Sequence, residues 1–217
     1  MTTDQWIRRV VKPLLFAACL VPAGLLVWRA LTDDLGANPI TEITHKTGDW
    51  TLQFVLITLT VTPARRLSGW HRLIKFRRML GLFAFFYGSL HFLTYLVLDQ
   101  FFDFSNIVVD IAKRPYITVG FSAFSAMVPL ALTSTAASIR RLGGRTWQRL
   151  HRLIYLTAIG GVVHYWWLVK ADVFWPEVYA GVVVLLLGFR VVMALPKRWP
   201  RSPLAKLPST DFISPGS

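Results

Sequence analysis

The chain has 217 residues, of which 54% are hydrophobic and 14% aromatic, with a mean hydropathy of +0.48 and a formal net charge of +13. This composition is too apolar for an ordinary soluble domain, and one helical bundle would use nearly the whole length, leaving no room for a soluble catalytic domain. The single cysteine, Cys19, excludes an internal disulfide and any cysteine-ligated zinc or iron–sulfur site.

Six long apolar runs predict an all-α membrane protein, a bundle of six transmembrane helices over residues 13–195. The approximate bounds of the runs are 13–30, 48–62, 79–98, 116–136, 152–169 and 177–195. The second run is short, carries Asp49 and Gln53, and is expected to end at Thr62-Pro63. Residues 1–12 are expected to form a cytoplasmic interfacial turn, and residues 196–217 a disordered cytoplasmic tail.

The distribution of charge predicts the orientation of these helices. The N-terminus, the 63–78 loop, the 137–152 loop and the tail hold 18 of the 24 Lys and Arg residues. The intervening loops and their borders hold nine of the 11 acidic residues. This positive-inside asymmetry predicts a multi-pass protein of the bacterial inner membrane with both termini in the cytoplasm. It also favours membrane lipid over nucleic acid as the partner of the basic loops; RNA binding is the alternative.

A repeated segment contains the first candidate site. The segment ending at Asp172 has a counterpart 73 residues earlier, which aligns His164 with His91 and Gly161 with Gly88. The two copies of G-x-x-H lie in spans that run in the same direction, so both imidazoles are expected at one depth. Each glycine lies on the same helix face as its histidine and would leave a slot for a flat macrocycle. The pattern therefore predicts two axial ligands of a haem iron; an interhelical hydrogen bond is the alternative.

The expected depth of this site follows from helix geometry. His91 lies 13 residues beyond Arg78, which is about 20 Å along a helix. In a hydrocarbon core about 30 Å thick, this distance places the histidine pair in the outer half of the membrane.

His151 lies in a different environment, at the basic start of the fifth span. It precedes His164 by 13 residues, or about 20 Å, and points about 140° away around an ideal helix, so the two cannot bind one iron. Its counterpart in the repeat is Arg78. His151 is either a structural interfacial histidine or part of a second redox site. The arginines near it would suit an anionic cofactor or a quinone headgroup, or else anionic lipid: Arg77, Arg78, Arg149 and Arg152.

At these residues the chain resembles the ferric-reductase-like membrane domain, and within it the haem-binding membrane subunits of bacterial periplasmic methionine sulfoxide reductase systems. The resemblance covers the six spans, His91, the His151–His164 pair and the short basic inner loops. It implies b-type haem, FMN and a periplasmic molybdenum-containing catalytic subunit. Electrons would come from the respiratory quinone pool or from a cytoplasmic flavin reductase.

Two departures from related families limit this resemblance. Two-haem ferric reductases and NADPH oxidases carry two histidines on each of two helices, whereas the inner position of the third span here is Arg78 or Arg77. A complete second bis-histidine site is therefore not expected. Those proteins also continue into a flavin and nicotinamide domain, and without one this chain is not expected to oxidise NADPH by itself.

The sequence thus predicts an electron-transfer subunit with no catalytic residue of its own. His91, His164 and His151 are the candidate ligands, and Gly88 and Gly161 the residues facing the macrocycle. One alternative is a haem b subunit with another partner, such as a metalloreductase. The other is a non-redox transporter with a histidine proton relay. A transporter should show a buried acid–base chain, yet no Asp, Glu or Lys lies deep in any predicted span.

Overall fold

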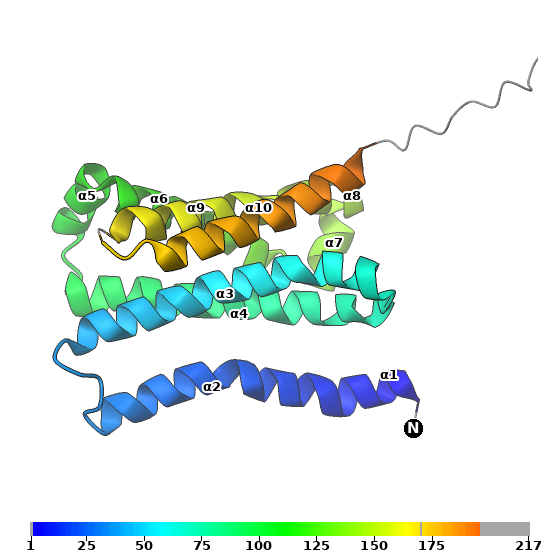
Figure 1. The fold of residues 1–217 in the computed structure, drawn as a ribbon, viewed down its shortest axis with the longest axis horizontal. Coiled ribbons are helices and arrows are strands. Elements are labelled where there is room, and N and C mark those ends of the chain that lie inside the picture. Colours follow the sequence, from blue (N-terminus) through cyan, green and yellow to red (C-terminus); the bar gives the residue numbers. More distant parts are fainter. Residues whose placement is uncertain (1, 170, 196–217) are drawn as a thin grey trace, which may run out of the picture.

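A computed structural model describes residues 2–169 and 171–195, and every regular element in these ranges is helical. Six long helices run back and forth between the two ends of an elongated bundle (Figure 1). They are α2 (Lys12–Leu31), α3 (Pro39–Ser68), α4 (Ile74–Leu93), α6 (Pro115–Leu132), α9 (Leu153–Leu168) and α10 (Phe174–Ala194). Both ends of the described chain lie at one end of the bundle (Figure 1), called the inner end below. The opposite end is called the outer end.

Four helical segments are long and apolar enough to cross a bilayer: Thr3–Leu31, His71–Asp99, Pro115–Leu132 and Phe174–Ala194. The chain is therefore a multi-pass membrane protein. Of the other two long helices, α9 has only 16 residues, and α3 carries Glu42 and Asp49 near its outer end and Arg65 near its inner end. The number of membrane crossings thus stays a prediction at six, while the helical class of the fold is established.

Shorter helices occupy segments that the sequence analysis treats as turns or loops. The expected interfacial turn at the N-terminus is wrong, because α1 (Thr3–Trp6) and the π-helical η1 (Ile7–Val11) continue into α2. At the outer end, the π-helical η3 (Thr94–Asp99) extends α4, and α5 (Phe104–Lys113) follows it. At the inner end lie η2 (His71–Leu73), α7 (Ala136–Leu142) and α8 (Gly144–Leu150). The predicted tail at 196–217 lies outside the described residues.

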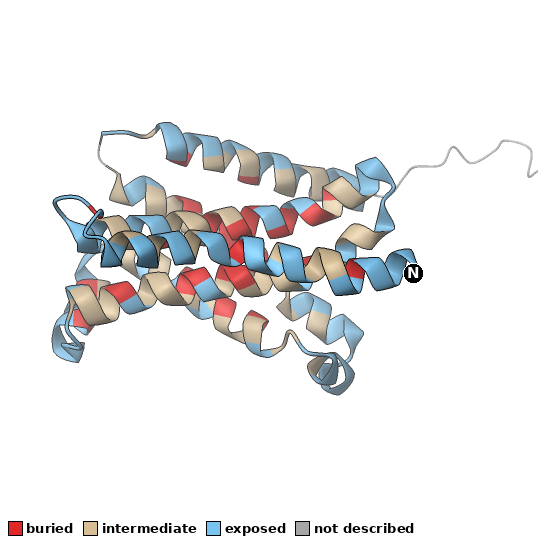
Figure 2. Ribbon diagram, turned by 90° about the horizontal axis from the view of Figure 1, so that it is seen from below, coloured by how far each residue is buried: buried red, intermediate tan, exposed pale blue. Residues whose placement is uncertain are grey.

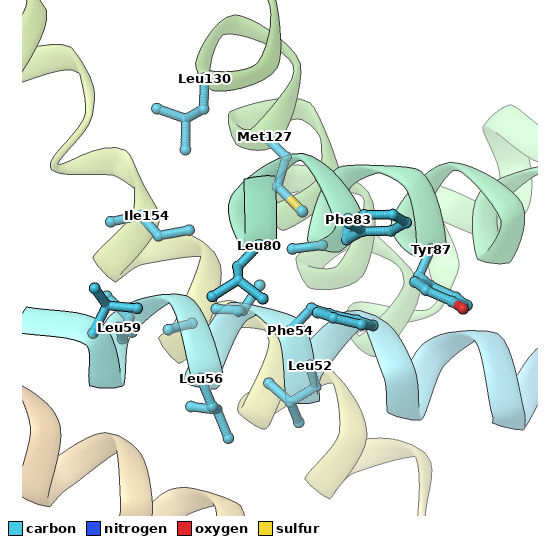
Figure 3. Packing of buried hydrophobic residues seen from close by; sticks show 14 of the residues in the cluster. Leu52, Phe54, Leu56, Leu59, Leu80, Phe83, Tyr87, Met127, Leu130 and Ile154 are labelled. Carbon is cyan, nitrogen blue, oxygen red and sulfur yellow. The ribbon is translucent and has the colours of Figure 1, made fainter. Parts of the chain in front are cut away.

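The core lies between α3, α4, α6 and α9, with α3 at its centre (Figure 3). Side chains of α3 such as Leu52, Leu56 and Leu59 are almost completely buried. Phe54 stacks on Tyr87 of α4 with ring centroids 5.2 Å apart. Because α3 faces other helices rather than lipid, it tolerates a less apolar sequence than its neighbours do. Helix α2, in contrast, is exposed along most of its length (Figure 2).

A proline and a tyrosine fix α2 to the rest of the bundle. Pro22 lies inside α2, where its ring and missing N–H disturb the regular hydrogen bonds. The Tyr87 hydroxyl of α4 accepts from the Ala23 amide (3.1 Å) and donates to the Cys19 carbonyl (2.8 Å). These are the amide and carbonyl that would bond each other in an unbroken helix. Tyr87 therefore inserts into the backbone of α2 and attaches it to α4.

Helix α3 extends beyond both ends of the predicted apolar run at 48–62, since it begins at Pro39 and ends at Ser68. The expected end at Thr62-Pro63 is wrong, because the helix continues through Pro63 to Ser68. Pro63 has no N–H for the Leu59 carbonyl, four residues earlier. The Arg190 guanidinium of α10 donates to that carbonyl instead, and also lies 5.6 Å from the centre of the Tyr155 ring. An arginine of a neighbouring helix thus satisfies the carbonyl that the proline frees.

Candidate functional site

Two histidines from different helices meet near the outer end of the bundle. His91 comes from α4 and His164 from α9, and their ring centroids are 6.1 Å apart with an angle of 77° between the ring planes. Both rings line one cavity of about 400 Å³ enclosed by α3, α4, α6 and α9. The structure therefore brings together, at one depth, the two histidines that the repeat aligns.

Backbone carbonyls orient both imidazole rings. His91 Nδ1 lies 2.9 Å from the Thr44 carbonyl oxygen, and His164 Nδ1 lies 2.7 Å from the Tyr116 carbonyl oxygen. Because a carbonyl oxygen can only accept, each Nδ1 must carry the proton and donate. Each Nε2 then carries a lone pair, and no hydrogen bond to another described residue occupies it. A hydrogen bond from the ring nitrogen that does not bind the metal, here Nδ1, is the usual way in which proteins orient a metal-binding histidine.

Two glycines on neighbouring helices make room for these rings. A Cβ at Gly120 would lie 2.6 Å from His164 Nδ1, and a Cβ at Gly48 would lie 3.1 Å from His91 Cε1. Each glycine is four residues after the carbonyl that orients the ring, which is one helical turn. An imidazole that donates to this carbonyl therefore lies against the helix turn that contains the glycine. A side chain at Gly120 would therefore displace His164.

Sequence reasoning missed Gly48 and Gly120, although a signal for them exists. They are 72 residues apart, as are the acceptor positions Thr44 and Tyr116, almost the spacing of the two histidines. The internal repeat therefore extends to the helices that pack against α4 and α9. The hydrogen bonds from the histidines to these carbonyls join residues 47 or 48 positions apart on different helices, so a search for patterns within single helices does not find them.

Gly88 and Gly161, the two glycines that the sequence does single out, line the same cavity. A Cβ at Gly88 would meet Thr51 at 3.4 Å, and a Cβ at Gly161 would meet Leu52 at 3.3 Å. An alanine thus fits at Gly88 with ordinary contacts and at Gly161 with a small shift of Leu52. A larger side chain at either position would extend into the cavity. These glycines keep the space beside the histidines open, whereas Gly48 and Gly120 let the rings approach the backbone.

The protein side chains alone do not suffice to hold a bare metal ion here. Over residues 2–169 and 171–195, no group of three or more His, Cys, Asp or Glu side chains is arranged to bind one. Structural zinc sites use four protein ligands. Metal–imidazole bonds of about 2 Å would place two ligating nitrogens about 4 Å apart, which ring centroids 6.1 Å apart allow. A metal between His91 and His164 would therefore have to bring its other ligands with it.

The rim of the cavity is polar and lies at the outer end. Arg114, whose side chain is 54% exposed, pairs with Asp110 at 3.0 Å. The Tyr95 hydroxyl donates to the same carboxylate at 3.4 Å, and Arg114 donates to the Tyr116 hydroxyl at 3.4 Å. Tyr116 also supplies the carbonyl that orients His164. The segment between α5 and α6 thus connects the outer surface directly to the histidine pair.

The structure places His151 at the inner end, away from this cavity. Its Nε2 lies 3.1 Å from the Thr133 hydroxyl, and the Trp147 ring stacks on the imidazole with centroids 3.8 Å apart. Burial and the positive charge of Arg77 lower the pKa of His151, so its neutral form is favoured at pH 7. Within the described chain, its Nε2 is thus hydrogen-bonded and one ring face is covered.

The four candidate arginines do not form a single cluster. Arg77 is close enough to His151 to affect its pKa, and Arg149 and Arg152 are exposed around the same end of the bundle. Arg78 faces α2 instead, where it lines a groove with Lys12 and Lys75. Adjacent residues on a helix point about 100° apart, which separates Arg78 from its neighbour Arg77.

The fold and the site together define a multi-pass helical membrane protein that holds a pair of ligand-ready imidazoles in one internal cavity. Residues 47–162, which include His91 and end two residues before His164, match the family described as ferric reductase like transmembrane component. The chain is 53% identical over 198 residues to a protein of Herminiimonas arsenicoxydans, covering 90% of this chain and 91% of the relative. It therefore belongs to the ferric reductase-like family.

Further relatives of similar length show the same similarity. A protein of Azospira oryzae is 55% identical over 193 residues, which is 88% of this chain and 83% of the relative. One of Ralstonia nicotianae is 53% identical over 185 residues, which is 84% and 85% of the two chains. All three relatives are named protein-methionine-sulfoxide reductase heme-binding subunit MsrQ.

Proposed function

We propose that this chain is a b-type cytochrome subunit that carries electrons across the bacterial inner membrane to a periplasmic protein-methionine-sulfoxide reductase. The observation that carries the proposal is the pair of Nε2 atoms of His91 and His164, which share one cavity while both Nδ1 atoms are held by backbone carbonyls. The relatives' names support it, because they describe heme-binding subunits of such a reductase.

The residues around the histidines fit a haem. The cavity volume of about 400 Å³ is within the range of small-molecule sites, and side chains such as Leu52, Val55 and Phe124 make much of its lining apolar. Gly88 and Gly161 leave space on both sides, and the macrocycle would supply the ligands that the protein lacks here. A haem held by both His91 and His164 would supply one-electron transfer and would leave the iron no open position for substrate.

In this function the protein itself would position the two imidazoles and would surround the haem with apolar side chains. The Thr44 and Tyr116 carbonyls keep each imidazole in the tautomer that offers Nε2, and hydrogen bonds of this kind increase the basicity of a ligand. The helices α3, α4, α6 and α9 surround the ring pair, and the apolar part of their lining would separate a bound haem from water. A site near the outer end then lies close to the periplasm, where the molybdenum-containing catalytic subunit of our proposal would dock.

Electrons would be supplied from the opposite end. His151 lies in the turn before α9, and His164 lies about 16 Å beyond the start of that helix at Leu153. Arg77 is close enough to lower its pKa, and Arg149 and Arg152 are exposed arginines within two residues of it in sequence. Guanidinium groups bind phosphate and carboxylate in a bidentate manner, so this region suits an anionic FMN, a quinone headgroup or a cytoplasmic flavin reductase. Arg78 does not take part in this proposal, since it faces α2.

Removal of either ligand tests the haem assignment. His91→Ala and His164→Ala should each abolish most of the low-spin reduced-minus-oxidised absorbance, because one imidazole cannot fill both axial positions. His45→Ala is the matched control, since His45 is an exposed histidine at the cavity rim. Far-ultraviolet circular dichroism should show that all three variants remain helical. Wild-type spectra in both ligand variants would disprove the bis-histidine assignment.

Reporter fusions test the proposed orientation and the six crossings. Fusions after Lys113 and Lys170 should report a periplasmic location, and fusions after Arg78, Arg145 and Arg201 a cytoplasmic one. Inverted results at any two of these five positions would overturn the six-span arrangement.

A further inference from the structure

A second hollow lies on the lipid-facing surface between α2 and α4. This groove has a volume of about 430 Å³, and none of its lining residues lines the histidine cavity. Its residues come from one face of each helix. On α2 they are Lys12, Phe16 and Leu20, at intervals of four, and on α4 they are Lys75, Arg78, Met79, Leu82, Phe83 and Phe86.

The groove has a cationic end and an apolar end. The three basic residues Lys12, Lys75 and Arg78 are the first groove residues of their helices, so their charges gather at the inner end. Lys75 pairs with Asp4 at 2.9 Å. In the described part of the chain no carboxylate pairs with Lys12 or Arg78. The inner end of the groove therefore carries uncompensated positive charge next to the membrane surface.

The rest of the groove is lined only by apolar side chains. They extend over about 6 Å along α2, from Phe16 to Leu20, and about 10 Å along α4, from Met79 to Phe86, at 1.5 Å per residue. Phe16 packs edge-on against Phe83 with ring centroids 5.0 Å apart, which forms the floor. Phe16 and Leu20 are nevertheless exposed at 50% and 38%, so these surfaces are left for another apolar molecule to cover.

We propose that this groove binds an anionic phospholipid of the leaflet at the inner end. The phosphate would lie between Lys12 and Arg78, and an acyl chain would lie over Phe16, Leu20 and Leu82. A soluble phosphate needs only the cationic end, and a neutral apolar molecule needs only the apolar end. A molecule with both parts, in the observed order, is a membrane lipid with a negative headgroup.

The bound lipid would also help to hold α2 in place. Helix α2 is exposed along most of its length, and the Tyr87 hydroxyl attaches it beyond the groove. Closer to the inner end, Asp4 of α1 pairs with Lys75 and Arg72. Between these two attachments, the two helices face each other across the groove, and the lipid fills this interval.

The test compares lipids on the full-length protein in detergent. Short-chain phosphatidylglycerol, phosphatidylcholine and glycerol 3-phosphate are titrated separately, and binding is measured by native mass spectrometry. Phosphatidylglycerol should bind at least about tenfold more tightly than phosphatidylcholine. Glycerol 3-phosphate should not displace it even in hundredfold excess, because it has no acyl chains. Equal binding of the two lipids, or displacement by glycerol 3-phosphate, would overturn the proposal.

Substitutions then assign the binding to this groove. Lys12→Gln with Arg78→Gln should weaken phosphatidylglycerol binding about 25-fold, at about a factor of five for each lost charge. Arg140→Gln with Arg141→Gln on α7 is the matched control, since both are exposed arginines at the same end, and it should change binding less than twofold. Helical circular dichroism and an unchanged haem spectrum verify that both variants are folded. An equal loss in the control would show that binding is merely electrostatic and would contradict the groove assignment.

Discussion

The outer and inner ends of the bundle contain corresponding positions of one repeated segment, but the structure uses them differently. At the outer end, His91 and His164 meet, and each imidazole is fixed through Nδ1 so that Nε2 faces the cavity. At the inner end, the position of His151 corresponds to Arg78, and the Nε2 of His151 is bonded to Thr133. The difference shows that a histidine in a helix becomes a candidate ligand through the groups that orient it. The repeat alone does not decide this.

The largest expected effect is at the outer end, and its size should differ between the glycine beside His164 and the glycine beside His91. Gly120→Ala should lower haem content severely, because its Cβ would lie 2.6 Å from His164 Nδ1 and must displace the ring. Gly48→Ala should lower it less, since the nearest ring atom is 3.1 Å away and the ring can shift by a few tenths of an ångström. Haem per protein, from the pyridine haemochrome assay, measures both.

A control for these variants is Gly24→Ala in α2, where a Cβ would have no neighbour within 4 Å. It should retain the wild-type haem content. Full haem occupancy in Gly120→Ala would show that the orientation by the Tyr116 carbonyl is not required for binding.

Substitutions that fill the cavity beside the histidines should cause the next largest loss of haem. Gly88→Leu and Gly161→Leu should each reduce haem content by adding a side chain to the space beside the histidines. Gly181→Leu on α10 has no neighbour within 4 Å of its Cβ and should bind haem normally. Absorbance at the haem Soret band per mole of protein is the measurement. Full occupancy in both cavity variants would eliminate the proposed role of these glycines.

The inner end should respond in rate rather than in haem content. His151→Ala should slow reduction of the haem by the physiological donor, while His91→Ala removes the haem itself. Stopped-flow reduction by dithionite, which bypasses the donor site, should be unchanged in His151→Ala. If His151→Ala loses haem as completely as His91→Ala does, His151 is itself an essential ligand and the donor-site proposal fails.

The smallest expected effect is a pH dependence of stability at the inner end. Burial lowers the pKa of His151 in the folded protein, whereas the unfolded chain has a value of about 6.5. The unfolded state therefore binds more protons below about pH 6.5, and the contribution of His151 to stability is lost as the pH falls from there. The difference in Tm between wild type and His151→Gln should shrink between pH 8 and pH 5. A constant difference over this range would contradict the assignment.

The all-helical membrane class was predictable, because long apolar runs follow from the thickness of the bilayer itself. The exceptions have local physical causes. Pro63 suggested the end of a helix, but Arg190 donates to the Leu59 carbonyl in place of the missing N–H, from a position 131 residues beyond Leu59 in sequence. The α5 helix lies in a segment expected to be a loop. Its Asp103 side chain accepts from the Asn106 amide, a helix cap that hydropathy does not reveal.

The histidine pair was predictable for a different reason, namely the repeated G-x-x-H segment. The repeat shows which positions correspond, but it does not show which main-chain groups from other helices contact them. Gly48, Gly120 and the Thr44 and Tyr116 carbonyls act from α3 and α6, so their roles appear only when the helices are packed together. The separation of Arg78 from Arg77 likewise depends on the position of α2.

The main-chain acceptors of the two histidines have a consequence for how such a site evolves. Thr44 and Tyr116 have side chains of different size and shape, and each orients its histidine through a carbonyl oxygen that every amino acid possesses. No point substitution at these positions deletes the acceptor, so the orienting hydrogen bond does not itself restrict which residue stands there. Selection falls instead on Gly48 and Gly120 one turn later, where any side chain would crowd the ring. Across diverging descendants, the orienting residues should therefore drift while the empty positions beside them stay fixed.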